Sequence, residues 1–348
     1  MNILNSIDMP NPPTYFGSVK NGFNAVANHI QIILFPICLD LFLLFGPQLR
    51  ITNLVVNWTN NFLIRFNVLM PIFNFFNENN ASPVTEQITI ADQIAIIDEL
   101  KNRLSSVNLF LNLSTFPIGI PSIVIPGAAV NPVGRPFEIE LSSILLIFGL
   151  IIFLTLIGLG FGVLYFNALV SLLSENDRKY SIKLFFWQYS QLFLIGLIFL
   201  ALLFIIFLPG IIIFSFLSAI NPFIGSLLFF GFLFLLIWLS FPLIYTIHGI
   251  LIYKKNILSA ALTSFHLVRN SVPGSGLFIS LVILIYLLFN SLWRIPPSDS
   301  WLVLAAIAGH AFLFTGLFAS TIIYYRNCIE WMRELIKRNA HPINSFKV

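Results

Sequence analysis

The feature that most constrains this chain is a long stretch without a charged side chain. Residues Leu184–Tyr253, between Lys183 and Lys254, contain no Asp, Glu, Lys or Arg, and Phe, Leu and Ile follow one another in long runs. A helix rises about 1.5 Å per residue, so about 20 apolar residues cross roughly 30 Å of hydrocarbon. The stretch is therefore long enough for two membrane crossings with a turn between them.

Two proline-containing pairs interrupt this stretch, Pro209-Gly210 and Asn221-Pro222. Proline removes a backbone donor and glycine loosens the chain, so both pairs are candidate helix ends. We expect one crossing from Leu184 to Leu208 and another from Pro222 to Ile247. The segment between them, Ile211–Ile220, is too short to cross and is expected to be a re-entrant or interfacial piece.

The composition agrees with a protein that lives in a membrane. The 348 residues are 58% hydrophobic and only 9% charged, and 38 of them are Phe, whereas a soluble domain carries about 25% charged residues. A charge at the bilayer centre costs at least ~2.5 kcal/mol, which explains the deficit. The net charge of +4 is too small to indicate nucleic-acid binding and is read as orientation charge.

The remaining apolar segments complete an all-α bundle of about six transmembrane helices. The further crossings are expected near residues 30–49, 141–166, 276–293 and 301–325. Pro36 is a candidate kink in the first, and Gly46-Pro47 ends it. The predicted organisation is a cytoplasmic tail with an interfacial helix (1–29), the first transmembrane helix (30–49), an extracytoplasmic helical insert (50–140), a five-helix membrane region (141–325) and a basic cytoplasmic tail (326–348).

The insert is polar and rich in Asn, unlike its surroundings. Apolar residues at helical spacing predict one amphipathic helix over Ile51–Leu69 and a second over Ile90–Leu111. The segment Phe116–Gly127 contains three prolines and two glycines and cannot continue a helix. We expect it to be an extended apolar loop that lies against the membrane or against the helices.

A weak internal repeat predicts three helical hairpins. In three places an amphipathic, interfacial segment precedes an outward crossing, at Ser18–Ile30, Tyr180–Tyr189 and Asn256–Asn270. The apolar face of the first consists of Val19, Phe23, Val26 and Ile30. The insert would then lie at the tip of the first hairpin.

The distribution of Lys and Arg predicts a multi-pass plasma-membrane (inner-membrane) protein with both termini in the cytoplasm. Short loops on the inner side carry the excess of basic residues. With the N-terminus inside, the short outer loops hold only Arg294. The inner segments hold Lys20, Arg178, Lys179, Lys183, Lys254, Lys255, Arg269, Arg326, Arg333, Lys337, Arg338 and Lys347.

One part of the chain is similar to a known kind of protein. The run Ser-Ala-Ala-Leu-Thr-Ser-Phe-His-Leu-Val-Arg-Asn at Ser259–Asn270 precedes a span, and the last span ends with Ile322-Ile-Tyr-Tyr-Arg326. This pattern, over Tyr180–Arg333, resembles uncharacterised bacterial polytopic membrane proteins, including those like the membrane domain of some glycerophosphoryl diester phosphodiesterases. The resemblance implies a six-helix membrane module of the cell envelope. It does not imply phosphodiesterase activity, because the catalytic domain has no counterpart here.

Four ionisable residues lie within or at the edges of the predicted spans. Asp40, His29, His248 and His310 must each be paired, hydrated or neutral there. A proton relay of Asp and His is one interpretation, and interhelical hydrogen bonding or a helix-end position is the other. Gly158 and Gly162 form a small-xxx-small face for close helix packing. Four amides are interpreted as interhelical hydrogen-bonding groups: Asn167, Gln188, Gln191 and Asn290.

No catalytic, nucleotide-binding or metal-binding motif occurs in the sequence. We therefore expect no cofactor, and the protein is not predicted to be an enzyme. The leading hypothesis is a non-enzymatic envelope membrane protein that binds membrane lipids, protein partners or a second copy of itself. The alternative is a transporter of small solutes or lipids that uses Asp40 and the histidines, and a membrane enzyme with an unrecognised site ranks last.

Overall fold

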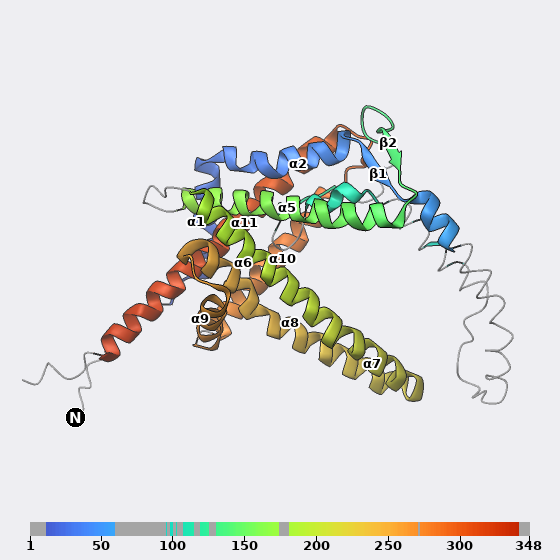
Figure 1. The fold of residues 1–348 in the computed structure, drawn as a ribbon. Coiled ribbons are helices and arrows are strands. Elements are labelled where there is room, and N and C mark those ends of the chain that lie inside the picture. The colour runs from blue at the N-terminus through green and yellow to red at the C-terminus, as the bar shows by residue number, and fades with distance from the viewer. Residues whose placement is uncertain are drawn as a thin grey trace, which may run out of the picture. The chain divides into compact units, whose positions relative to one another are not determined.

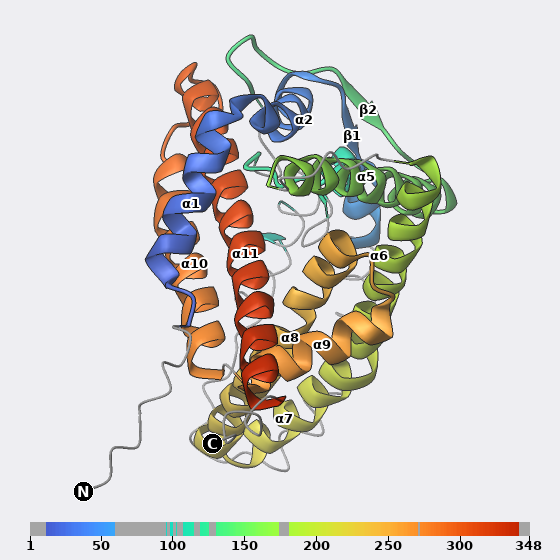
Figure 2. The ribbon, with the colours of Figure 1, turned by 90° about the vertical axis from the view of Figure 1, so that its left-hand side faces the viewer.

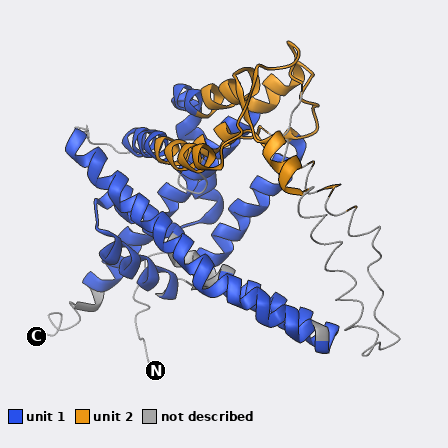
Figure 3. Cartoon of the chain, turned by 45° about the vertical axis from the view of Figure 1, so that its right-hand side comes forward, with its two compact units in different colours: residues 1–35, 159–292, 309–348 blue, residues 36–158, 293–308 orange. Residues whose placement is uncertain are grey.

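The computed structural model divides the chain into two compact units (Figure 3). It describes residues 12–59, 95, 98–99, 102, 107–114, 119–124, 130–173, 181–270 and 272–340. Unit 1 consists of Met1–Phe35, Leu159–Leu292 and Gly309–Val348, and unit 2 of Pro36–Gly158 and Trp293–Ala308. Much of the predicted insert, including most of its second amphipathic helix, and the two chain ends lie outside the described residues.

Helices make up nearly all of the described elements (Figure 1), which confirms the predicted all-α class. Residues 52–59 form the described part of the first amphipathic helix of the insert. The elements, in chain order, are α1 (Tyr15–Asn28), the 3-10 helix η1 (Ile30–Ile33), α2 (Leu34–Phe45), β1 (Gln48–Arg50), the 3-10 helix η2 (Leu109–Leu113), β2 (Glu138–Glu140), α5 (Ile144–Leu172), α6 (Ile182–Leu202), the π-helical turn η3 (Leu203–Phe207), α7 (Leu208–Ile220), α8 (Pro222–Tyr253), α9 (Ile257–Asn270), α10 (Val272–Trp293) and α11 (Leu302–Ala340).

Several of these helices are long and apolar enough to cross a membrane. Among the described residues there are four: Ile144–Leu172, Ile182–Ser218, Gly274–Trp293 and Leu302–Lys337. A fifth is added if α1 and residues Ile30–Phe45, which are bent by 91° at their break, form one span. α8 is a continuous helix at the predicted fourth crossing, although the side chains of its residues 237–243 lie outside the description. The helices are compatible with an integral membrane protein.

The first predicted crossing begins at Ile30 as expected, but it has no bend at Pro36 and is shorter than predicted. The sharp bend lies at His29, between α1 and η1, and not at Pro36. Pro36 lies in the first turn of α2, where a backbone N–H would have no partner within the helix, so proline is tolerated without a kink. The helix ends at Phe45, before Gly46, and the chain then enters strand β1. Residues 48 and 49 are therefore extended and not helical.

The pair Pro209-Gly210 does not end the third crossing. Residues 182–220 continue as α6, η3 and α7, so Ile211–Ile220 is part of one long helix and not a separate re-entrant piece. Pro209 lies in the first turn of α7, directly after the π-helical turn η3. A π turn changes the hydrogen-bonding pattern within a helix, and Pro209 itself has no N–H to donate to a preceding carbonyl oxygen.

The turn at Asn221 does occur where the sequence predicts it. The Asn221 side chain accepts hydrogen bonds from the backbone N–H groups of Phe223 (3.1 Å) and Ile224 (3.2 Å). This is an N-cap, followed by Pro222 at the first helical position. α8 then runs back alongside α7, so that residues 182–253 form one helical hairpin in unit 1 (Figure 1).

Only two of the three predicted interfacial segments are separate helices. α1 and α9 end at a break before the next element. The described part of the third, residues 181–189, continues directly into the body of α6. The three-hairpin repeat is therefore incomplete at its second copy, because nothing in residues 181–189 interrupts the helix.

Within unit 1, α1 packs directly on α11 (Figure 2). The buried residues of α1 are Ser18, Gly22 and Val26, one per turn. A Cβ on Gly22 would lie 2.5 Å from the backbone nitrogen of Ser320, so only glycine permits this approach. The contact face thus combines the small residues with Phe23 and Val26 of the predicted apolar stripe, whereas Ile30 of the stripe is exposed.

Unit 2 contains a short parallel strand pair that the sequence analysis did not predict. β1 pairs with β2 in the register Gln48↔Glu138 to Arg50↔Glu140. The buried Arg50 lies 3.2 Å from Glu138 in an ion pair. Leu49 donates its N–H to the side chain of Asn108 at 3.0 Å. The residues that begin and end the predicted insert therefore lie side by side.

Candidate functional site

Asp40 in unit 2 is fully buried and is bound to a loop that is distant in the sequence. It lies on α2, and its carboxylate accepts a hydrogen bond from the hydroxyl of Ser122 and one from the N–H of Ile123 at 3.2 Å. The described part of the predicted loop, residues 119–124, has no regular secondary structure. The carboxylate therefore anchors this loop to α2.

Apolar side chains surround this anchor. Leu44, Ile123 and Ile307 form a buried cluster. Partly buried neighbours complete it: Ile37, Leu41, Phe45, Val124, Trp293, Val303 and Leu304. The loop is thus held both by the hydrogen bonds of Asp40 and by apolar packing against α2 and the beginning of α11. Of the two predicted positions of this loop, against the membrane or against the helices, the structure shows the second.

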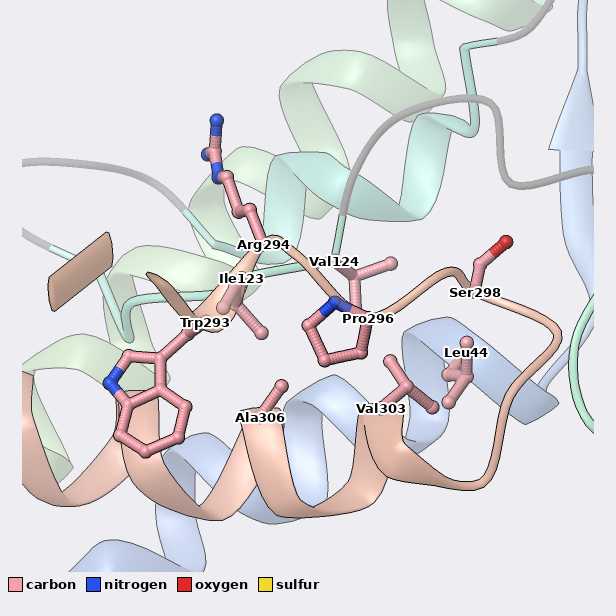
Figure 4. A pocket seen from close by; sticks show the side chains of 9 residues that line it. All are labelled: Leu44, Ile123, Val124, Trp293, Arg294, Pro296, Ser298, Val303 and Ala306. Atoms are coloured by element: carbon pink, nitrogen blue, oxygen red, sulfur yellow. The ribbon is translucent and has the colours of Figure 1, made fainter. Parts of the chain in front are cut away.

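A small cavity lies beside this cluster (Figure 4). Its volume is about 50 Å³, enough for a few water-sized spheres of about 10–15 Å³ but far below the roughly 300 Å³ of a small-molecule pocket. Ile123, Trp293 and Ala306 lie around it, whereas Arg294 points away. Asp40 is not among the lining residues. The cavity therefore offers neither the size nor the polar lining of a substrate site.

His248 is a buried bridge between α8 and α11 in unit 1. Its Nδ1 lies 3.0 Å from the carbonyl oxygen of Ile244, one turn earlier, and its Nε2 lies 2.9 Å from Thr321 Oγ1 on α11. The imidazole ring stacks on Phe318, with centroids 5.4 Å apart. Both ring nitrogens are thus in hydrogen bonds, as the interhelical interpretation predicts.

The other two histidines occupy different surroundings. His310 is buried on α11 beside the rings of Tyr286 and Phe314, each with its centroid 6.3 Å away. His29 is partly exposed at the C-terminal end of α1, where its backbone N–H donates to the carbonyl oxygen of Val26. The hydrogen bonds described above join Asp40 to Ser122 and Ile123, and His248 to Ile244 and Thr321, none of which is another of the four predicted residues.

The predicted glycine pair is buried, and other glycines also form close helix contacts. Gly158 and Gly162 are both buried on α5. Close approaches between helices are found at Gly22 against Ser320 and at Gly316, where the ring of Phe23 lies 2.7 Å from the position of a Cβ. Gly22 and Ser320 lie far apart in the sequence and on different helices, as do Phe23 and Gly316. A spacing pattern within one helix therefore does not reveal these contacts.

Buried amides join three helices of unit 1. Asn167 on α5 donates to Gln188 Oε1 on α6 at 2.7 Å. Gln188 in turn lies within 3.4–3.5 Å of the carbonyl oxygens of Ile250 and Leu251 on α8. Gln191 accepts from the N–H of Ile257 at 3.0 Å. These contacts confirm the predicted interhelical role for these three amides.

A second feature, absent from the predictions, is a group of polar and basic residues where α8 turns into α9. We call it the cationic elbow, and it consists of Tyr253, Lys255 and Thr263 with Arg333 of α11. Lys255 Nζ donates to Thr263 Oγ1 at 2.7 Å, and the Arg333 guanidinium lies 5.5 Å from the centre of the Tyr253 ring. Burial lowers the pKa of Lys255, and the nearby positive charge of Arg333 lowers it further.

Comparisons with known proteins return no relative. No protein-family model, no curated protein and no solved structure matches the chain. The resemblance to phosphodiesterase membrane domains thus stays a prediction. Over the described part of the chain, no group of three or more His, Cys, Asp or Glu side chains could hold a metal ion.

Proposed function

We propose that the protein is a non-enzymatic, multi-pass protein of the plasma membrane that binds membrane lipid along the hairpin of α6, η3, α7 and α8. Both termini would lie on the cytoplasmic side, as the distribution of basic residues predicts. The observation that carries the proposal is the amount of apolar helix surface that the hairpin leaves uncovered.

The length of the hairpin exceeds what a simple crossing needs. The segment Ile182–Ser218 contains 37 residues, which corresponds to about 55 Å at 1.5 Å per residue, against roughly 30 Å of hydrocarbon. Only 6% of its most apolar window is buried inside the protein. Such an excess is accommodated by tilting the helix or by thickening the surrounding bilayer.

The outer side of the hairpin is suited to acyl chains and not to another helix. Its inner seam uses small residues, since a Cβ on Gly225 would lie 2.4 Å from the backbone nitrogen of Ser218. Interfaces between membrane helices are enriched in such residues. The largely exposed outer residues are bulky instead: Ile205, Ile212, Phe216, Ile220, Phe223, Phe230 and Phe234.

A lipid-retention experiment tests this proposal. The full chain is purified in mild detergent, and the phospholipid retained per protein is measured by mass spectrometry. The double variant Ile212→Ser/Phe216→Ser should retain less lipid than Leu284→Ser/Leu288→Ser, a matched pair of exposed residues on α10. Wild type should also become more thermostable as the acyl chains of added phosphatidylcholine lengthen.

Two results would contradict the proposal. One is equal lipid retention by the two double variants together with no dependence on acyl-chain length. The other is cysteine cross-linking at Ile212 that joins two copies in the membrane, because the outer face would then be a protein interface. We rank the transporter alternative second, since Asp40 and His248 are both engaged in hydrogen bonds that join separate segments of the chain.

A further inference from the structure

The cationic elbow brings two positive charges together, and no acidic side chain among the described residues forms an ion pair with either of them. Lys255 is held by Thr263 at 2.7 Å, and Arg333 is placed over Tyr253. Among the described residues the only ion pair is Arg50 with Glu138, in the other unit. Glu330 and Glu334 flank Arg333 on α11, yet neither forms an ion pair with it or with Lys255. The protein thus maintains a repulsive pair that an external anion would neutralise.

The position of the elbow indicates where that anion comes from. It follows Tyr253, the last residue of the charge-free stretch, so it lies where an apolar helix emerges from hydrocarbon. The predicted orientation places this level at the cytoplasmic surface, whose lipids are anionic and attract juxtamembrane Lys and Arg. An aromatic residue beside the charges is also typical of this level.

We propose that the cationic elbow binds the phosphate group of an anionic phospholipid. Arg333 would offer its planar set of N–H donors to the phosphate oxygens, and Lys255 a point charge beside them. Tyr253 and Thr263 hold the two cations in place before the lipid arrives, which lowers the entropic cost of binding. This inference rests on the proposed lipid binding and names the class of lipid and the residues that select it.

Lipid titration followed by native mass spectrometry tests the elbow. The full chain in detergent is titrated with phosphatidylglycerol or with phosphatidylcholine of identical acyl chains. Wild type should bind phosphatidylglycerol more tightly, and Lys255→Gln and Arg333→Gln should each reduce that preference about fivefold. Lys20→Gln, an exposed lysine on α1 with the same change in charge, should leave it unaltered.

The possible outcomes separate the two proposals. If wild type retains both lipids equally, the elbow is not selective, although the hairpin still binds lipid. If it retains neither, the proposed function fails as well. Competition by inorganic phosphate in place of lipid, or by an acidic peptide, would overturn the assignment to a lipid headgroup.

The salt dependence of lipid binding by the wild type provides a second test, which holds even if a glutamine variant does not fold. The phosphatidylglycerol preference of wild type should fall as salt is raised, because the attraction is electrostatic. The charge-preserving variant Lys255→Arg should keep most of the preference. A preference that is insensitive to salt, or that Lys255→Arg abolishes, contradicts the proposal.

Discussion

The hairpin and α11 are both candidate membrane spans, but the protein buries them very differently. Half of the most apolar window of Leu302–Lys337 is buried, compared with 6% of the window in Ile182–Ser218. The less buried segment is the more apolar one. In a soluble protein the opposite holds, because water drives the most apolar residues inside. In lipid, acyl chains solvate Leu and Phe, so packing follows small and polar residues.

α8 shows the same contrast within one helix. Its first part contains the exposed residues Phe223, Phe230 and Phe234, whereas Tyr245 and His248 near its end are buried. His248 contributes a hydrogen bond to Thr321, which a lipid tail cannot replace. The apolar run is uniform in the sequence, so the polar residues decide which part of it packs against protein.

The strongest test of this contrast compares glycines from the two regions. Gly22→Leu places a side chain against the backbone of Ser320, and we expect it to destabilise the protein by about 3 kcal/mol through overpacking. Gly196→Leu in α6 meets nothing within 4 Å and should have little effect. Thermal unfolding in detergent, followed by size-exclusion chromatography, measures both. Similar losses for the two variants would show that the hairpin is packed too.

Asp40 provides a test in unit 2. Asp40→Leu leaves the Ser122 hydroxyl and the Ile123 N–H without their acceptor, and should cost about 2 kcal/mol. Asp40→Asn keeps an acceptor oxygen and should cost less. The loop around residues 119–124 should become more accessible to proteolysis only in the leucine variant. Equal losses for Asn and Leu would mean that the negative charge, and not only an acceptor oxygen, stabilises the loop.

Substitution of Gln188 tests whether a buried polar residue holds the largely exposed helix α6 against its neighbours. Gln188→Leu removes its contacts with Asn167 and with the Leu251 carbonyl oxygen, and should cost about 1 kcal/mol, in the upper part of the range measured for such bonds in membranes. Combined with Asn167→Leu, the loss should be less than additive. Ser190→Leu, an exposed position on the same helix, is the control and should be neutral.

Lys255 predicts a small pH dependence in lipid-free detergent. Its native pKa is lowered by burial and by Arg333, below an ordinary value of about 10.4. The native state therefore loses this proton at lower pH than the unfolded chain does, and stability rises with pH where the unfolded state binds more protons. Wild type should gain stability relative to Lys255→Gln as the pH rises toward about 10.4. A constant difference between the two melting curves would contradict this.

Local signals in the sequence predicted the helices well but not their partners. Asn221 and Pro222 form a turn that their own side chains specify, and the apolar runs identify the long helices. The prediction of a helix end at Pro209 was wrong, because the helix continues past this residue through a π turn that directly precedes α7. The contacts of Asp40 with Ser122 and of Lys255 with Arg333 join distant segments, and a single sequence carries no periodic signal for such pairs. Strands of only three residues, such as β1, are also too short to give a recognisable alternating pattern in the sequence.

The smallest change in stability is expected at Phe230, and this change best distinguishes a surface covered by lipid from one covered by protein. Phe230→Leu on the outer side of α8 should change stability by less than about 0.5 kcal/mol, because acyl chains fill the space that the smaller side chain leaves. The same substitution at Phe278, which is fully buried and stacks on Tyr324 at 3.9 Å, should cost about 1 kcal/mol. Both variants are compared by thermal unfolding in the same lipid-supplemented detergent. A clear loss at Phe230 would reveal a protein neighbour on this face, since only a fixed partner leaves a cavity that cannot be refilled.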